Sequence, residues 1–176
     1  MTSLSIAEWR DLNNNKIKSA AQVVTATKIN PWSSNSTAWV DIPDLQPVIT
    51  PYYSTSKILV IIKLSITPST PGHSMVRLTR NGTVIAAGDT RGNRTSCLFD
   101  LYGTTTYNTC GYEPRFKGAF WLDSPATTSA VTYKLQYANP YSSSYGAGIN
   151  YNAYSDSDTS YNYNTSSSVT LMEIMQ

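Results

Sequence analysis

Hydrophobic and polar residues alternate in many short runs along the chain, with turn-forming residues between the runs. The clearest run is 130–138, in which Val131, Tyr133, Leu135 and Tyr137 alternate with mostly polar residues. Successive side chains of a β-strand point to opposite faces, so these four side chains share one face. The run therefore predicts a strand with these four residues on one face and Thr132, Lys134 and Gln136 on the other.

A second run, 56–66, is rich in β-branched residues, and its apolar part is too long for a strand buried on one face alone. It predicts a central, well buried strand. Residues 75–80 and 83–87 flank Asn81 and Gly82. Both turn residues tolerate a positive φ angle, so this stretch predicts a β-hairpin.

Shorter strand-like runs complete the pattern. They lie at 39–42, 48–50, 97–101, 119–122 and 168–174. A total of about eight to ten short strands separated by turn residues is typical of a β-sandwich or β-barrel. We therefore predict one all-β domain over residues 30–176.

The first 29 residues show a different pattern from the later runs. Ser5 and Glu8 have the spacing of a helix capping box, and Ile6 and Trp9 would share one face of a helix. Three asparagines at 13–15 then favour turns over helix. We predict an N-terminal arm over 1–29, extended or with one short helix, that either packs across the main domain or serves for attachment.

The composition disfavours two classes of partner. Charged residues make up 14% of the chain, the net charge is +2, and the 13 lysines and arginines are scattered singly. Nucleic-acid binding requires a basic run or patch, so it is not expected. The longest aliphatic run, 58–62, is far shorter than a bilayer span, so we expect no membrane insertion.

The N-terminus lacks the basic and apolar regions of a secretory signal peptide. We expect synthesis and folding in a reducing cytoplasm, where thiols stay reduced. Cys97 and Cys110 are the two cysteines, and no neighbouring residues complete a zinc pattern. They could form one bridge, but two free thiols are the default expectation.

The segment 141–163 has the composition of a contact surface. It holds six of the chain's 13 tyrosines and no lysine or arginine. Tyrosine combined with serine, asparagine and glycine is the mixture found in antibody contact loops. A low-complexity surface loop or a disordered tail is the alternative. The strand-like run 168–174 that follows favours an ordered loop.

Candidate catalytic groups are few. His73 is the single histidine, and it lies in a turn before a strand, where a solvated side chain is expected. The carboxylates of the middle loops could pair for glycoside hydrolysis, with exposed loop acids as the alternative. They are Asp89, Asp100, Glu113 and Asp123. We predict a protein that is not an enzyme and keep a glycan hydrolase as a minor alternative.

Metal and cofactor signals are weak. Asp156 and Asp158 alternate near the late tyrosines, but Tyr161 stands where an EF-hand loop needs glycine. An irregular calcium site at the two aspartates is a minor alternative to the capping of turns. The chain has no phosphate-binding glycine loop or dinucleotide fingerprint, so we predict no cofactor.

Several short pieces of the chain, in their order, match the pattern of a known family. They are Trp39-Val-Asp-Ile-Pro, Ile49-Thr-Pro, Ser56-Lys-Ile-Leu-Val, Arg77-Leu-Thr-Arg-Asn-Gly-Thr with Ile85, Gly88-Asp, Leu122-Asp-Ser-Pro, Thr132-Tyr, Gly148-Ile-Asn and Val169-Thr-Leu-Met-Glu-Ile. Together they resemble the C-terminal domain of many bacteriophage tail-fibre-like proteins, which is frequent in aquatic phages. The resemblance covers roughly residue 22 to the end of the chain.

The resemblance implies a virion structural protein: a homotrimeric antiparallel jelly roll of the C1q-like or TNF-like kind whose loops bind a host-surface glycan or protein. Only about twenty residues precede the match, which implies a short tail fibre or adhesin. The alternative is a capsid or tail decoration protein, attached through Ile6 and Trp9. In both cases its partners would include other virion proteins.

The residues expected to contact the receptor are tyrosines of the middle loop and of the late tract. Their rings would stack against sugars or receptor side chains, with packing in the core or at a subunit interface as the alternative. They are Tyr102, Tyr107, Tyr112, Tyr141, Tyr145, Tyr151, Tyr154, Tyr161 and Tyr163.

Overall fold

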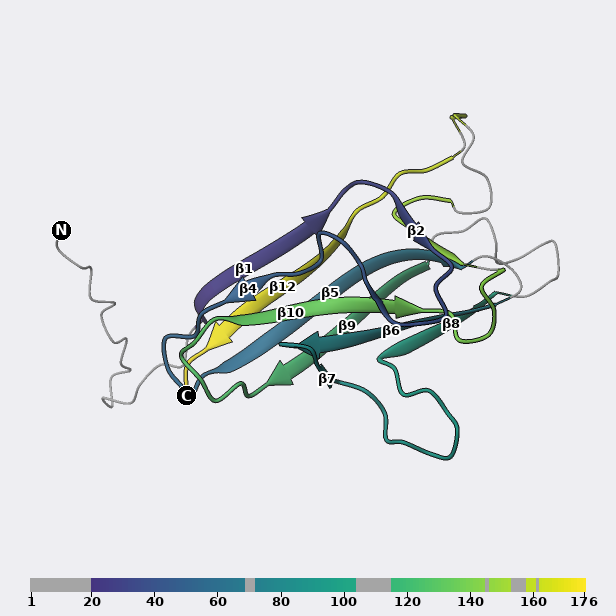
Figure 1. Cartoon of the computed structure of the whole chain (residues 1–176). Helices are drawn as coiled ribbons and strands as arrows, with labels where there is room; N and C mark the ends of the chain where they lie inside the picture. Colours follow the sequence, from purple (N-terminus) through teal and green to yellow (C-terminus); the bar gives the residue numbers. More distant parts are fainter. Residues whose placement is uncertain (1–19, 69–71, 104–114, 145, 153–157, 161) are drawn as a thin grey trace.

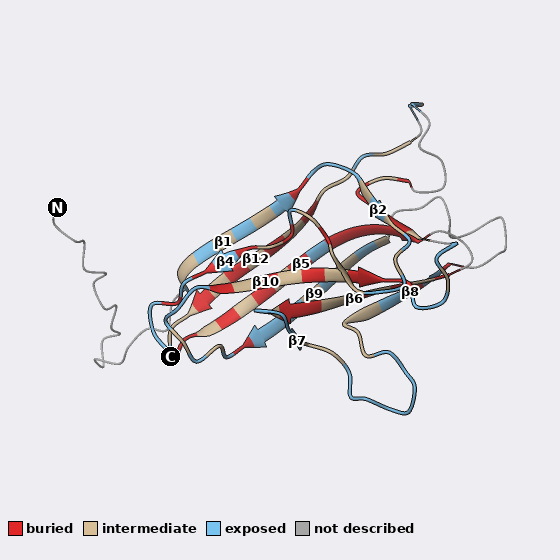
Figure 2. Cartoon of the chain, viewed as in Figure 1, coloured by how far each residue is buried: buried red, intermediate tan, exposed pale blue. Residues whose placement is uncertain are grey.

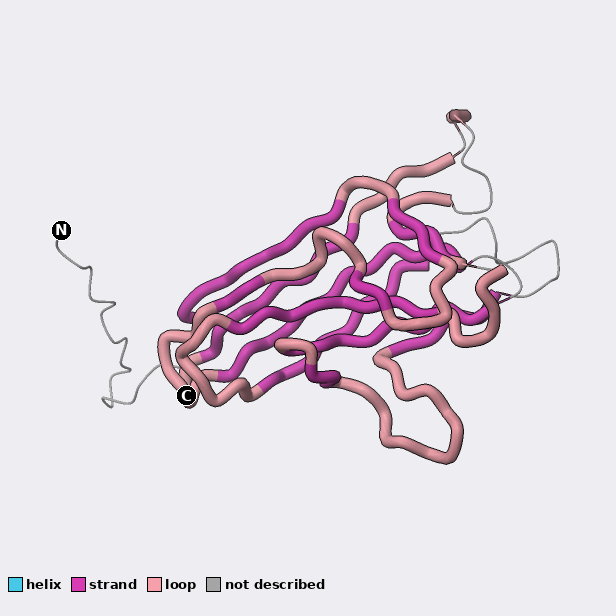
Figure 3. The backbone as a smooth tube through the Cα atoms, viewed as in Figure 1, coloured by secondary structure: helices cyan, strands magenta, loops and turns pink. Residues whose placement is uncertain are grey.

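The computed structural model of the chain describes residues 20–68, 72–103, 115–144, 146–152, 158–160 and 162–176 (Figure 1). These segments form β-strands joined by turns and loops, and they contain no helix (Figure 3). The all-β prediction is confirmed. The arm before residue 20, with Ile6 and Trp9, lies outside the described residues.

The described residues form twelve strands. They are β1 (Ala20–Lys28), β2 (Trp32–Ser34), β3 (Val40–Asp41), β4 (Val48–Ile49), β5 (Lys57–Pro68), β6 (Gly72–Arg80), β7 (Thr83–Ile85), β8 (Phe99–Gly103), β9 (Arg115–Asp123), β10 (Val131–Ala138), β11 (Ala147–Ile149) and β12 (Ser167–Ile174).

The strands form two antiparallel sheets that face each other as a sandwich (Figure 1). In sheet one the order is β1-β12-β5-β9, and β11 and β2 continue beyond β12 along the same edge of β5. In sheet two β10 and β6 form the centre. Short strands β3 and β4 pair with the far edge of β10, and β7 and β8 with the far edge of β6.

The chain crosses repeatedly from one sheet to the other, and its closing strand β12 inserts between β1 and β5. Strands that are neighbours in sequence therefore often lie in different sheets, as in a jelly roll. The predicted antiparallel jelly-roll-like sandwich is confirmed. Each sheet has an inner face toward the other sheet and an outer face turned away from it.

The hairpin predicted at Asn81 and Gly82 is present between β6 and β7. Both residues have positive φ angles, 48° and 83°, and Arg80 pairs with Thr83. A turn with two positive φ angles matches the right-handed twist of the flanking strands. The two residues of this turn were therefore enough to predict the hairpin.

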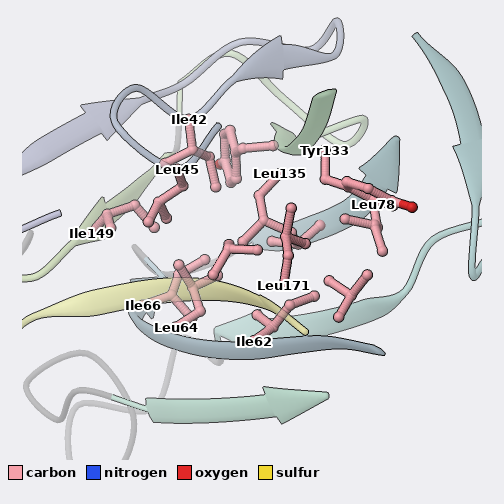
Figure 4. Packing of buried hydrophobic residues seen from close by; sticks show 14 of the residues in the cluster. Ile42, Leu45, Ile62, Leu64, Ile66, Leu78, Tyr133, Leu135, Ile149 and Leu171 are labelled. Carbon is pink, nitrogen blue, oxygen red and sulfur yellow. The ribbon is translucent and has the colours of Figure 1, made fainter. Parts of the chain in front are cut away.

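The core lies between the two inner faces and is built largely by alternation along the strands (Figures 2 and 4). The four residues predicted to share one face of β10 are all buried, and they belong to the same cluster as the inward side chains of β5 and β12. The buried cluster comprises Ile42, Leu45, Ile49, Ile58, Val60, Ile62, Leu64, Ile66, Val76, Leu78, Leu101, Val131, Tyr133, Leu135, Tyr137, Ala147, Ile149, Val169 and Leu171.

Strand β5 is central, as predicted, because β12 and β11 pair with one edge and β9 with the other. Its burial differs from the prediction. From residue 57 to residue 63 it alternates, so Ile58, Val60 and Ile62 are buried while Leu59 and Ile61 point outward and stay partly exposed. The long apolar run thus supplies the core on one face and an apolar outer surface on the other.

Residues 20–28, placed in the arm by the sequence, form β1 at one edge of sheet one. Eight of them pair with β12, from Ala20 opposite Ile174 to Lys28 opposite Ser167. The sheet therefore begins before the boundary expected at residue 30. Backbone pairing with the closing strand, which lies far away in sequence, recruits this segment.

Candidate functional site

The late tyrosine tract is anchored to the sandwich at its base. Within it, β11 pairs with β5 on one side and with β2 on the other, and Ile149 is fully buried. Tyr151 forms an isolated bridge with Asn164, and the Tyr163 hydroxyl lies 2.8 Å from Thr67 Oγ1. These two tyrosines are partly buried, so in part they serve the fold.

Asn150 is the centre of this anchor. It is buried with a positive φ angle of 69°, its Nδ2 donates to Lys28 O at 2.9 Å, and its Oδ1 accepts from Ser167 Oγ at 2.6 Å. Its backbone N–H donates to Ser65 O at 3.1 Å. One buried asparagine, through its side-chain amide and its backbone N–H, thus ties together three strands of sheet one. Each bond satisfies a polar group that water cannot reach.

Several of the predicted contact residues lie outside the described residues. They are Tyr107, Tyr112, Tyr145, Tyr154 and Tyr161, together with Asp156 of the weak calcium hypothesis. Asp158 is described and exposed. Over the described ranges, no group of three or more histidine, cysteine, aspartate or glutamate side chains is placed to hold a metal ion.

Two predicted tyrosines, Tyr102 and Tyr141, come together with His73 and Asp100 at one end of sheet two's outer face. His73 on β6 is directly opposite Tyr102 on β8, and their ring centroids are 4.9 Å apart. The Tyr141 ring, in the turn after β10, lies 6.3 Å from the same imidazole. Tyr102 is 51% exposed and Tyr141 is 65% exposed, so both rings offer free surface.

His73 Nδ1 lies 2.7 Å from Asp100 Oδ2. Because an ionised carboxylate only accepts, the proton of this bond is on Nδ1. The other ring nitrogen, Nε2, is therefore an acceptor when the imidazole is neutral. The pair fixes both the tautomer and the orientation of the ring between the two tyrosines.

A cavity of about 480 Å³ opens beside this cluster. Its lining includes His73, Met75 and Asp100 from β6 and β8, Arg94 from the β7–β8 loop, and Tyr141. This volume falls within the range of sites that hold small molecules. We call these five residues, with Tyr102, the sheet-two cluster.

Cys97 also lines the cavity, as a free thiol. Partial burial, followed by the negative charge of Asp100, raises its pKa above the ordinary range. A thiol held in its protonated form is a weak nucleophile, so its position favours a packing role. Cys110 lies outside the described residues.

The second notable surface is the outer face of sheet one. Here Val23, Met172, Leu59 and Leu122 form one cross-strand row over β1, β12, β5 and β9. The next row places Ile61 opposite Phe120, which is 74% exposed. We call this surface the apolar face; its members are Val23, Leu59, Ile61, Phe116, Phe120, Leu122, Met172 and Ile174.

The outer face of sheet two is polar beyond the sheet-two cluster. Asp41 accepts from Lys134 Nζ at 2.7 Å and from Gln136 Nε2 at 2.6 Å. These bonds, first that from Lys134, lower the pKa of Asp41 below its ordinary value of 3.8. Arg77 donates to Gln136 at 2.8 Å, and its guanidinium lies 4.3 Å from the centroid of the Trp39 ring.

Asp123 was expected in a loop, and the structure corrects this prediction. It ends β9, is buried, and accepts two bonds of 2.9 Å from Arg80 and one of 2.6 Å from the Tyr133 hydroxyl. Burial, then the bond to Asp123, raises the pKa of Tyr133. Asp123 thus links the edge of sheet one to sheet two and is not a free carboxylate for hydrolysis.

His73 was misplaced by the prediction from sequence, which put it in a turn before a strand, whereas it lies in β6. Asp100 was counted among the loop acids, although the strand-like run 97–101 also contained it, and it lies in β8. In β6 Ser74 points inward and Met75 outward, so polarity gave no signal there, whereas Asp100-Leu101-Tyr102 alternates visibly. The pairing of His73 with Asp100 across β6 and β8 was not visible, because it depends on the register of the two strands.

Comparison of the sequence with protein-family models and with curated proteins found no match to either. Helices able to cross a membrane are absent from the part of the chain that the structure describes.

Proposed function

We propose that the chain is a virion structural protein, the β-sandwich domain of a short trimeric fibre or adhesin. Its copies associate through the apolar face, and the end of the sandwich that bears the sheet-two cluster contacts a host surface. The observation that carries the proposal is the apolar face. The resemblance to tail-fibre-like domains supports both the location in a virion and the assembly of three copies.

The extent of the apolar face argues for a covered surface. Phe116 and Phe120 each carry about 150–250 Å² of surface, and both are more than half exposed. With Val23 and Leu122, also more than half exposed, the patch is on the order of the 400 Å² above which an exposed patch marks an interaction site. Water contact with such a patch is costly, so a partner that covers it gains free energy.

The occupant that fits this face is another copy of the same chain. Strand β9 is an edge of sheet one, and its Phe120 and Leu122 extend the apolar face to that edge. A head-to-tail contact, in which one surface receives a different surface of the next copy, forms a ring when the rotation between copies closes. Burying aromatic and aliphatic side chains is typical of obligate interfaces.

The charges of the apolar face are compatible with self-association. Its lysines, Lys57 and Lys63, both donate within the chain, to Ser124 at 2.7 Å and to Ser166 at 3.4 Å. Lys63 also lies 5.8 Å from the centroid of the Phe116 ring. An acidic partner is therefore not needed to satisfy them.

Light scattering on the purified chain at micromolar concentration tests the assembly. We expect the measured molar mass to be three times the chain mass of 19.4 kDa. Phe120→Glu should release monomers, because it buries an unpaired charge in the interface. Val84→Glu is the matched control, since Val84 is an exposed aliphatic residue on the outer face of sheet two.

A monomeric wild-type protein would contradict the proposed assembly, as would equal effects of the two glutamates. The virion setting has its own test. Antibodies raised against the chain should label tail or fibre structures in electron micrographs of the virions that encode it, and particles without label would remove this part of the proposal.

A further inference from the structure

We propose that the cavity beside His73 and Tyr141 is a binding site for a neutral saccharide. This inference rests on the proposed role of that end of the sandwich in host contact, and it names the class of ligand. The inference is carried by the exposed Tyr141 ring, an oriented imidazole and a carboxylate around one cavity, with the exposed Tyr102 ring beside His73.

The size of the site suits a small ligand. The cavity of about 480 Å³ is open to solvent and has the volume to hold one or two sugar rings. The turn that bears Tyr141 is fixed at its base, because Tyr141 N–H donates to Asn139 Oδ1 at 3.1 Å and Asn139 N–H donates to Ser36 O at 2.8 Å. Binding therefore does not first require the ordering of this backbone.

The rings suit the apolar face of a pyranose. The C–H groups on one side of a sugar ring pack against an aromatic face, as other apolar groups do. Tyr141 and Tyr102 offer such faces on either side of His73, and both are more than half exposed. A stacked sugar would thus cover ring surface that the chain itself leaves in water.

The polar groups suit sugar hydroxyls. Asp100 uses Oδ2 for His73, which leaves Oδ1 and the remaining lone pairs to accept from hydroxyl groups. The Nε2 atom of His73 accepts a further hydroxyl proton, and the Arg94 guanidinium can donate to a ring or hydroxyl oxygen. The set therefore contains both acceptors and donors, as a polyhydroxyl ligand requires.

The charge balance favours a neutral ligand. The formal charges of Arg94 and Asp100 cancel, and the imidazole adds a charge only when it is protonated. The Asp100 carboxylate therefore offsets the attraction of Arg94 for an anionic sugar. An acidic saccharide should therefore bind more weakly than its neutral counterpart.

The test uses saturation-transfer NMR and calorimetry on the full chain. The probes are the methyl glycosides of glucose, galactose, mannose and N-acetylglucosamine, with methyl glucuronide as the acidic comparison. We expect at least one neutral glycoside to bind. Tyr141→Ala should weaken this binding about tenfold through lost stacking, and Asp100→Asn should weaken it by a similar factor through lost charge-assisted bonds.

Tyr53→Ala is the matched control. Tyr53 is 56% exposed and lies just before β5, whereas His73 lies shortly after it, so the two positions are at opposite ends of this strand. Its removal should leave binding unchanged. The inference is overturned if no neutral glycoside binds, if glucuronide binds more tightly than the glucoside, or if neither Tyr141→Ala nor Asp100→Asn weakens binding.

Molar mass measured on the same samples separates this inference from the proposed function. A trimer that binds no glycoside refutes the saccharide site and leaves the assembly standing. A monomer that binds glycosides refutes the assembly and leaves the saccharide site standing.

Discussion

The two outer faces of the sandwich have opposite chemistry, although both belong to antiparallel sheets with the same kind of inner face. On sheet one the outward rows carry Leu59, Ile61 and Phe120 with few charges. On sheet two they carry Asp41 and Lys134, joined with Gln136 and Arg77 in a network of hydrogen bonds. The difference supports the proposal that another copy of the chain covers the outer face of sheet one, whereas the polar outer face of sheet two suits contact with water.

The sheet-two cluster sharpens the comparison, since two exposed aromatic rings, Tyr102 and Tyr141, gather there. Tyr141 lines a cavity together with hydrogen-bonding groups. On sheet one the aromatic rings sit on a continuous apolar surface. Rings beside polar groups suit a polar small ligand, whereas rings among aliphatic groups suit a subunit interface.

The largest expected effect comes from Asp123, the inward residue that holds β9, the edge strand of the apolar face, to sheet two. Asp123→Ala should lower the free energy of unfolding by about 3 kcal/mol or more, because it leaves Arg80 without its buried partner. Denaturant unfolding measures the loss. Asp41→Ala, which breaks an exposed pair on sheet two, is the control and should cost about 0.5 kcal/mol.

Equal losses in these two variants would mean that the link through Asp123 is no more important than a surface ion pair. The oligomeric state of Asp123→Ala adds a second readout. Because β9 carries Phe120 and Leu122, loosening this strand should also raise the fraction of monomer.

A smaller effect is expected from trimming one aliphatic side chain on each outer face. If copies cover the apolar face, Ile61→Ala should cost about 2 kcal/mol or more per chain, as for a core residue. Its thermal midpoint should then depend on protein concentration. Val84→Ala, on the outer face of sheet two, should cost well under about 1 kcal/mol. A small, concentration-independent effect at Ile61 would indicate that this face is exposed in solution.

The smallest effect concerns the titration of Asp41. Its pKa in the folded protein is lower than 3.8, so the folded state binds this proton less tightly than the unfolded state. The stability it contributes is present above the unfolded pKa and is lost as the pH falls through the folded pKa. Asp41→Asn should therefore be less stable than wild type near neutral pH, by about 0.5 kcal/mol because the pair is partly exposed.

The difference between Asp41→Asn and the wild type should vanish as the pH falls below the lowered pKa of Asp41 in the folded protein. Thermal melts between neutral and acidic pH measure it. A difference that stays constant over the whole pH range would assign the effect to packing rather than to the charge of Asp41.

Much of the strand pattern could be predicted from the sequence. The alternation in β10 identified four residues that share one face, and the turn chemistry of Asn81 and Gly82 identified the hairpin. These features depend on residues close together in the chain, so local rules apply to them. The tract that contains Ile149 was expected as one loop excursion, and its short strand β11 was missed because only pairing with β5 and β2 creates it.

The candidate site was predicted in part. Tyr102 and Tyr141 were named as contact residues from composition, and the structure places both on exposed surface. Their meeting through His73 and Asp100 could not be predicted, because 27 residues separate the histidine from the aspartate. A one-residue change of register between β6 and β8 would turn these side chains to opposite faces.

By itself, the sequence determined the all-β class, the turns and which residues of each strand share a side, because side-chain direction alternates with a period of two. The tertiary structure alone decided which side faces the other sheet. Leu59 and Ile58 are equally apolar neighbours, yet the packing of the two sheets buries one and leaves the other at the surface. It also joined Arg80 to Asp123, 43 residues away. Such contacts follow from long-range pairing, which no local pattern records.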